Sequence, residues 1–146
     1  MNRAKKLIKE YPDLFPSPFG IECGDGWLEL IRFVCKALQY KVNNRDVVFI
    51  HFSQIKEKFG FLRIYFNFEV AINTIHGNTK QAEAMSEELR NLISTVEELS
   101  GIVCEDCGRM KNDKFNVQTR TPRGMWKRTV CDECYKIEKN RTTWKS

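Results

Sequence analysis

The sequence has few of the features that mark membrane proteins, secreted proteins or the common classes of enzyme. No apolar run reaches about 18 residues, so no transmembrane helix is expected. The first residues are basic but contain no apolar stretch of the kind that a secretory signal needs, which predicts a cytoplasmic protein. The chain also has no G-x-S-x-G motif, no glycine-rich phosphate loop, no H-x-x-x-H pair and no carboxylate cluster suited to a metal. Nothing here argues for an enzyme, and we expect none.

Histidine is scarce, and its positions limit the kinds of metal site that the chain can form. Only two of the 146 residues are histidines, His51 and His76, and none lies between residues 77 and 146. A catalytic zinc ion keeps one coordination position open and normally has histidine or a carboxylate among its ligands. A metal site built from cysteines alone in the C-terminal region would therefore be structural.

Cysteine, by contrast, is present in a pattern that predicts a metal site. Four of the six cysteines form two C-x-x-C pairs, Cys104 with Cys107 and Cys131 with Cys134, and 23 residues separate the pairs. Two intervening residues allow both sulfurs of a pair to face one metal ion, and four thiolates fill a tetrahedral site. We expect one structural zinc ion, which contributes on the order of 10 kcal/mol of apparent binding free energy to the stability of this region. A rubredoxin-like iron site has similar spacing and stays open as the alternative.

The residues around the cysteine pairs predict a zinc-finger module. Gly108 directly after Cys107 suits a zinc knuckle, and the spacer alternates around a "TPRG" turn, which indicates a hairpin. A short helix is expected after Cys134. Knuckle, hairpin and helix in this order are typical of a treble-clef or zinc-ribbon finger. The remaining cysteines, Cys23 and Cys35, are expected to be small core residues.

The first hundred residues contain two strong helical patterns. Apolar residues at helical spacing predict helices at about 25–42 and 79–99, with Asp25 and Asn78 as their N-caps. The second helix has a strict a/d stripe, which we interpret as packing on the rest of the chain, with a homodimer through 79–99 as the alternative. The residues of this stripe are Ala82, Met85, Leu89, Leu92, Val96 and Leu99.

Between the helices, β-branched and aromatic residues predict a β-hairpin with strands at about 47–57 and 61–68. Two strands alone are marginally stable, so helices or another strand must cover the apolar face. We therefore expect an α+β domain at residues 1–100, with helices packed on a β-hairpin or small antiparallel sheet. The four-cysteine zinc module at residues 101–146 is expected to be fixed to the preceding helix.

The length of the hairpin loop decides which side chains share a face of the sheet. A three-residue loop over 58–60, ending on a left-handed glycine, would pair Ile50 with Phe68 and Phe52 with Phe66. It would also gather the apolar residues of both strands on one face, whereas a two-residue loop would mix the two sets. We therefore expect the longer loop. The opposite face would then be a candidate ligand site, formed by His51, Ser53, Arg63 and Tyr65, next to Ile55 and Asn67.

The net charge of +5 lies entirely in the cysteine-rich region. Residues 101–146 hold 11 Lys and Arg against 6 Asp and Glu, whereas residues 1–100 hold 13 of each. A zinc ion with four thiolates adds −2, which leaves about +3. Basic and aromatic side chains on a small hairpin can contact phosphates and stack on bases, and the alternative is a solvated charged face. The candidate nucleic-acid contacts are Arg120, Arg123, Trp126, Lys127 and Arg128.

Several stretches resemble a group of small proteins from phages and bacterial genomes. They are "SQIKEKFGFLRIYF", "AEAMSEEL", "CEDCG" and, after a tryptophan, "TVCDEC", in this order, and the resemblance covers roughly residues 25–135. It implies a fold and a bacterial cell or phage-infected host as the setting, rather than an activity. A phage setting would favour a role directed at the host, such as inhibition of a defence or metabolic protein.

Together these observations predict a zinc-stabilised binding protein that is not an enzyme and acts on a macromolecular partner. A protein partner ranks first, and a membrane is not expected. The first alternative is a DNA- or RNA-binding accessory protein that uses the basic zinc hairpin. The second is a small-molecule or nucleotide binder that uses the polar face of the 47–68 hairpin.

Overall fold

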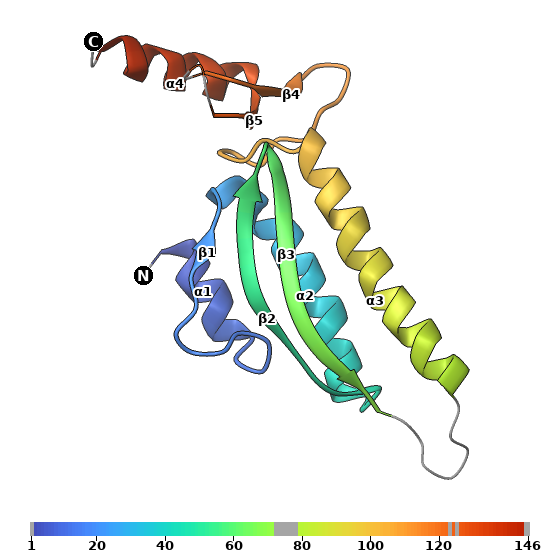
Figure 1. The fold of residues 1–146 in the computed structure, drawn as a ribbon. Coiled ribbons are helices and arrows are strands. Elements are labelled where there is room, and N and C mark those ends of the chain that lie inside the picture. The colour runs from blue at the N-terminus through green and yellow to red at the C-terminus, as the bar shows by residue number, and fades with distance from the viewer. Residues whose placement is uncertain (1, 72–78, 123, 125, 145–146) are drawn as a thin grey trace.

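The computed structural model describes residues 2–71, 79–122, 124 and 126–144, and its fold belongs to the α+β class that the sequence predicts. Helices and strands alternate irregularly along the chain (Figure 1). In chain order they are α1 (Arg3–Glu10), β1 (Ile21–Glu22), α2 (Leu28–Asn43), β2 (Val47–Lys58), β3 (Phe61–Val70), α3 (Thr79–Leu99), β4 (Val117–Arg120), β5 (Arg128–Cys131) and α4 (Asp132–Trp144). In the described ranges, no helix is both long and apolar enough to cross a membrane.

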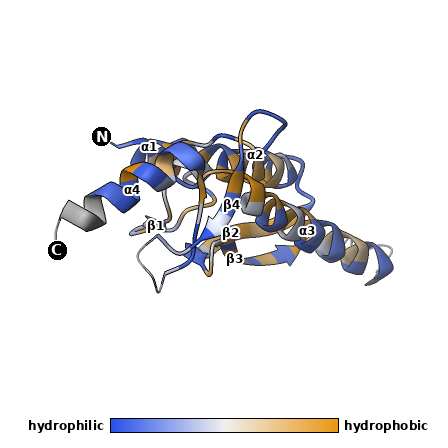
Figure 2. Cartoon of the chain, turned by 90° about the horizontal axis from the view of Figure 1, so that it is seen from above, coloured by the Kyte–Doolittle hydropathy of each residue, from blue (hydrophilic) through white to orange (hydrophobic). Residues whose placement is uncertain are grey.

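The first three strands form one mixed sheet with β2 at its centre. β1 pairs with β2 in parallel, and β3 pairs with β2 in the antiparallel direction. α2 packs on β2, α3 packs on β3, and the two helices contact each other. Figures 1 and 2, viewed at right angles, place both helices to one side of the β2–β3 ribbon and no helix over its opposite face. The apolar core therefore lies between the sheet and the helices, and its largest fully buried side chains are Trp27, Phe52, Leu7, Leu14, Ile31 and Leu38.

The turn between β2 and β3 is shorter than the predicted three-residue loop. Only two residues, Phe59 and Gly60, join the strands, since Lys58 pairs directly with Phe61. Both turn residues have positive φ, 54° for Phe59 and 88° for Gly60. Two successive left-handed residues are the geometry of a type I′ turn, which matches the natural twist of a hairpin. The predicted loop length is therefore wrong.

A β-bulge in β2 compensates for the shorter turn. The register between β2 and β3 shifts at Ser53, where one extra residue enters β2. The shift restores the parity that the shorter turn alone would have changed. Consequently the predicted pairs of Ile50 with Phe68 and of Phe52 with Phe66 are confirmed.

The irregular register also changes which side chains face the core. Ile55, expected on the polar face, is fully buried and pairs with Ile64. Val48, expected on the apolar face, is 62% exposed because a second shift lies between Val47 and Phe49. Both differences follow from bulges, which the alternating pattern of a strand does not reveal.

The beginning of α2 differs from the prediction because it contacts a distant part of the chain. A 3-10 turn over Asp25–Trp27 precedes the helix, which begins at Leu28. Asp25 is not the N-cap, since Gly24 occupies the cap position of the turn and no side chain caps either element. The backbone N–H groups of Gly24 and Gly26 instead donate to Glu105. A contact with the cysteine-rich region thus replaces the local cap.

α3 spans the residues that its pattern predicts, Thr79–Leu99, whereas its predicted N-cap Asn78 lies outside the described residues. The apolar stripe of α3 packs against the core of the same chain. Leu89 and Val96 are each 1% exposed, and Met85 packs against the same core. A homodimer through this helix stays a prediction.

The C-terminal end of α3 covers the outer edge of β3. The backbone N–H of Leu62 donates to the Ser100 hydroxyl over 2.9 Å, and that of Ile64 donates to a Glu97 carboxylate oxygen over 2.9 Å. Side-chain acceptors thus satisfy donors at a strand edge that has no further strand beside it. These bonds also fix the end of α3, from which the chain continues directly into Cys104.

Candidate metal centre and adjoining surfaces

The two cysteine pairs lie at the two ends of a unit built from a knuckle, a hairpin and a helix, which we call the treble-clef unit; the sequence predicts a treble-clef or zinc-ribbon finger. Gly108 has φ of 82°, and its N–H donates to the Cys104 carbonyl over 2.9 Å, which closes the knuckle around the first pair. β4 and β5 form an antiparallel hairpin. Cys131 is the last residue of β5, and Cys134 lies in the first turn of α4. Knuckle, hairpin and helix therefore present the four thiols to one point.

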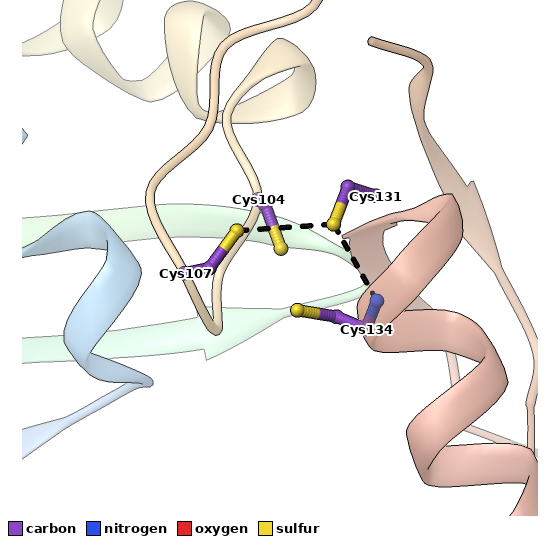
Figure 3. Close-up of side chains that lie close together, drawn as sticks. All are labelled: Cys104, Cys107, Cys131 and Cys134. Atoms are coloured by element: carbon purple, nitrogen blue, oxygen red, sulfur yellow. Dashed lines mark hydrogen bonds between the residues drawn. The ribbon is translucent and has the colours of Figure 1, made fainter.

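The four sulfur atoms lie close enough together to hold one metal ion. All four lie within 4.8 Å of one another, and Figure 3 shows them converging from the knuckle and from the start of α4. The Sγ atoms of Cys107 and Cys131 are 3.8 Å apart. Four sulfurs at about 2.3 Å from a tetrahedral zinc ion would be about 3.8 Å from one another. The geometry thus fits one metal ion held by four thiolates.

Hydrogen bonds within the cluster lower the pKa of one of the four thiols. Burial alone would raise the pKa of Cys131, but the backbone N–H of Cys134 and the neighbouring thiols donate hydrogen bonds that lower it. Burial raises the pKa of Cys107 and of Cys134. Since metal ligation needs thiolates, ion binding must release the protons of those ligands that are still neutral thiols.

The two remaining cysteines stand apart from this cluster. Cys35 is fully buried in the core, and Cys23 is half-buried and packs against it. Burial raises the pKa of each thiol to about 12, and nearby carboxylates add to the effect at Cys23. Both residues are therefore neutral packing groups, in keeping with the prediction.

The treble-clef unit is attached to the start of α2 by buried hydrogen bonds. The indole N–H of Trp27, a fully buried side chain, donates to the Val103 carbonyl over 2.8 Å. The N–H of Gly26 donates to the Glu105 carbonyl over 2.7 Å, and the N–H of Gly24 donates to the Glu105 carboxylate over 2.9 Å. No local pattern in the sequence indicates these contacts. The domain division at residue 100 stays a prediction, although two separate apolar clusters meet near it, one ending at Val103 and one starting at Cys104.

Glu105, which is buried within the knuckle, and Arg128, which is half-buried, form a charged pair. Glu105 is 2% exposed, and burial raises the pKa of its carboxyl despite the Gly24 N–H and the nearby Arg128. Burial would lower the pKa of Arg128, but the charges of Glu105, Asp106 and Glu138 outweigh it and raise the pKa. Arg128 thus stabilises the unit, because it compensates carboxylates that would otherwise repel one another.

The predicted nucleic-acid residues of the β4–β5 hairpin are mostly engaged within the protein. Arg128 pairs with the carboxylates just described. Arg120 pairs with Asp132, and its guanidinium lies over the Tyr135 ring, 4.7 Å from the ring centroid. Trp126 is 72% exposed, and Lys127 is exposed as well. Arg123 lies outside the described residues. The interpretation of this hairpin as a nucleic-acid interface stays a prediction.

The residues of the predicted ligand face lie on the side of the sheet that none of the described helices covers (Figures 1 and 2). His51 and Arg63 are half-buried, whereas Ser53 and Tyr65 are exposed. Ser53 is the bulge residue, so the structure does not place it in register with the other three. His51 stacks on Phe49 with 5.1 Å between ring centroids.

An apolar groove that the sequence did not reveal lies between α2, α3 and the knuckle. Its volume is about 400 Å³. Cys107 and Gly108 contribute to one wall. The apolar side chains that line it are Leu30, Phe33, Val96, Leu99, Val103 and Met110. These residues come from three elements that are far apart in the sequence, so only the tertiary structure brings them together.

Comparisons of the chain with protein-family models, with curated proteins and with solved structures found no match.

Proposed function

We propose that this chain is a zinc-stabilised binding protein, not an enzyme, and that its apolar groove receives a segment of a protein partner. The observation that carries the proposal is the groove itself. Its volume of about 400 Å³ lies within the usual range of binding clefts, and one of its walls belongs to the metal-binding knuckle. The function of the metal is then to hold that wall in place.

Zinc is the ion that the donor set favours. Four thiolates in a tetrahedral arrangement select zinc or iron among the common metals, and zinc is the usual ion of treble-clef units. Four sulfur ligands leave no coordination position for water or substrate. The centre therefore supports a structural role and gives no support to metal-assisted hydrolysis.

The exposure of the groove residues supports binding of a protein segment. Phe33 is 57% exposed, Met110 is 50% exposed and Leu99 is 37% exposed, although each is a large apolar side chain. Contiguous apolar side chains at a surface mark interaction sites, and methionine adapts its shape to different partners. Arg3, Asp25 and Glu29 line the same groove and supply a polar rim.

The occupant that fits this groove is a short amphipathic segment, with apolar residues facing inward and polar residues at the rim. Two helices with a hollow between them commonly receive the apolar side of a helix or an extended peptide. In the phage setting that the resemblance implies, such a segment would belong to a host protein that this chain inhibits.

A matched pair of substitutions on α2 tests this proposal. Phe33→Glu places a charge in the groove and is expected to abolish partner binding, because groove anchors typically contribute at least 2 kcal/mol, or about 30-fold in affinity. Tyr40→Glu is the control, since Tyr40 is 63% exposed on the same helix and does not line the groove. The measurement is quantitative mass spectrometry of proteins that co-purify with each tagged variant from bacterial lysate, followed by titration of the purified candidate.

The result that supports the proposal is a protein retained by the original chain and by Tyr40→Glu but lost from Phe33→Glu. Its purified form must then bind the original chain directly, with the expected difference between the two variants. Equal retention by both variants would contradict the groove as the binding site. A second copy of the chain, detected as a dimer that Phe33→Glu dissociates, would replace the foreign partner with self-association.

A further inference from the structure

The outward face of the β2–β3 ribbon has an ordered distribution of side chains that the groove does not involve. Next to the turn, Lys56 pairs across the strands with Arg63. The next pair towards the other end is Gln54 with Tyr65, followed by His51 with Asn67. The last pair of this face is Phe49 with Glu69. The face therefore changes from cationic side chains near the turn to aromatic and amide side chains further along, and it ends beside one carboxylate.

The cations of this face are without carboxylate partners. Within the described part of the chain, Lys56, Lys58 and Arg63 form no ion pair, whereas three arginines of the zinc module all do. Two like charges directly opposite each other destabilise a sheet, so the Lys56–Arg63 pair favours a nearby anion. Glu97 and Glu98 of α3 line a small surface pocket with Arg63, but neither makes an ion pair with it among the described residues. Glu22, the register partner of Lys56 on β1, makes no ion pair with it among the described residues.

Exposed aromatic rings accompany these cations. Tyr65 is 43% exposed, and the Lys56 ammonium lies 5.8 Å from its ring centroid. Phe49 is 38% exposed and stacks on His51 with an angle of 17° between the rings. Flat rings on an open sheet are suitable platforms for nucleobases, which stack on any aromatic side chain.

We propose that this face binds single-stranded nucleic acid. Lys56, Lys58 and Arg63 contact phosphates, while Tyr65 and the Phe49–His51 stack receive bases. At about 3.3 Å per residue, β2 provides a platform of roughly 35 Å, which is long enough for several nucleotides. An acidic peptide would also satisfy the cations, but it would leave the rings without partners. The face lies apart from the groove, so this proposal stands independently of the proposed function.

Fluorescence anisotropy tests the proposal with the full-length, zinc-loaded protein. The probes are a labelled oligo(dT) and an oligo(U) of about a dozen nucleotides, titrated at 50 and 200 mM salt. We expect binding that weakens steeply with salt. Tyr65→Ala should weaken it about 5- to 150-fold, the usual effect of losing one stacking ring. The double variant Lys56→Gln and Arg63→Gln should lower the salt slope by about 1.4, for two lost phosphate contacts on a single strand.

The β4–β5 hairpin supplies the control. The double variant Trp126→Ala and Lys127→Gln removes two exposed side chains of the β4–β5 hairpin, the other candidate nucleic-acid surface. It should leave the affinity for the oligonucleotides within about twofold, because it does not change the sheet face. Absence of binding at 50 mM salt would overturn the proposal. So would binding that depends on Trp126 and Lys127 but not on Tyr65, or binding that a poly-glutamate competitor removes as efficiently as unlabelled oligonucleotide does.

Discussion

Replacing Cys104 with serine is expected to release the metal ion and to unfold the treble-clef unit. The unit has a very small apolar cluster, whose fully buried members are Cys104, Val117, Val130 and Cys131. Two of these four are candidate metal ligands, so the cluster is not expected to offset the conformational entropy of ordering the unit without a metal ion. Zinc in such units supplies on the order of 10 kcal/mol of apparent binding free energy. The loss of one ligand should therefore have the largest effect of any single substitution discussed.

Native mass spectrometry and amide NMR spectra measure this outcome. We expect one zinc ion per original chain, none in Cys104→Ser, and loss of dispersed amide signals from β4, β5 and α4. Cys23→Ser is the matched control, since Cys23 is outside the sulfur cluster and should leave the zinc content unchanged. A Cys104→Ser variant that retains one zinc ion and its dispersed signals would show that the four thiolates do not hold the unit together.

Replacing Gly26 with alanine is expected to separate the knuckle from the start of α2. A Cβ at this position would lie 2.1 Å from the Cys104 carbonyl oxygen and 2.5 Å from that of Glu105. Both neighbours are backbone atoms, so neither can rotate away. Steric overlap costs roughly 1–3 kcal/mol, and loss of the Gly26 to Glu105 hydrogen bond adds about 1 kcal/mol. The free energy of unfolding should fall by about 2–4 kcal/mol.

Chemical denaturation followed by tryptophan fluorescence provides the measurement, because the buried Trp27 donates to Val103 at the same contact. Gly20→Ala is the control, since a Cβ there would meet no atom within 4 Å. We expect this control to change stability by less than about 0.5 kcal/mol, as for other unconstrained surface positions. Equal stability of the two variants would mean that the unit is not packed against α2. Partner binding in the groove should fall with Gly26→Ala as well, because Gly26 and the knuckle line it together.

The sequence predicts the elements well because their signals are local. Four cysteines at fixed spacing predict the sulfur cluster, and a regular apolar stripe predicts α3 over its described residues, Thr79–Leu99. The hairpin shows where such reasoning stops. Two deviations, a two-residue turn and a bulge at Ser53, cancel each other, so the distant pairs of Ile50 and Phe52 are right although the assumed loop is wrong.

The surfaces are harder to predict because they depend on contacts between distant segments. Arg120 and Arg128 look like free cations in the sequence, but Asp132, Asp106 and Glu105 neutralise them in the fold. The groove joins residues of α2, α3 and the knuckle. Gly24 and Gly26 permit the close backbone approach beside the groove, but nothing in the sequence points to Glu105 as the partner. Their sequence pattern indicates a tight backbone but does not say which backbone lies against it.

The central claim is that the metal centre is a closed four-sulfur site with a structural role, so that function resides in the surfaces around it. X-ray absorption at the zinc edge of the purified, full-length protein tests this claim most directly. The account predicts one zinc ion per chain with four sulfur neighbours at about 2.3 Å and no oxygen or nitrogen neighbour. A site with fewer sulfurs and a bound oxygen would contradict it, because an open coordination position is what a catalytic zinc ion requires.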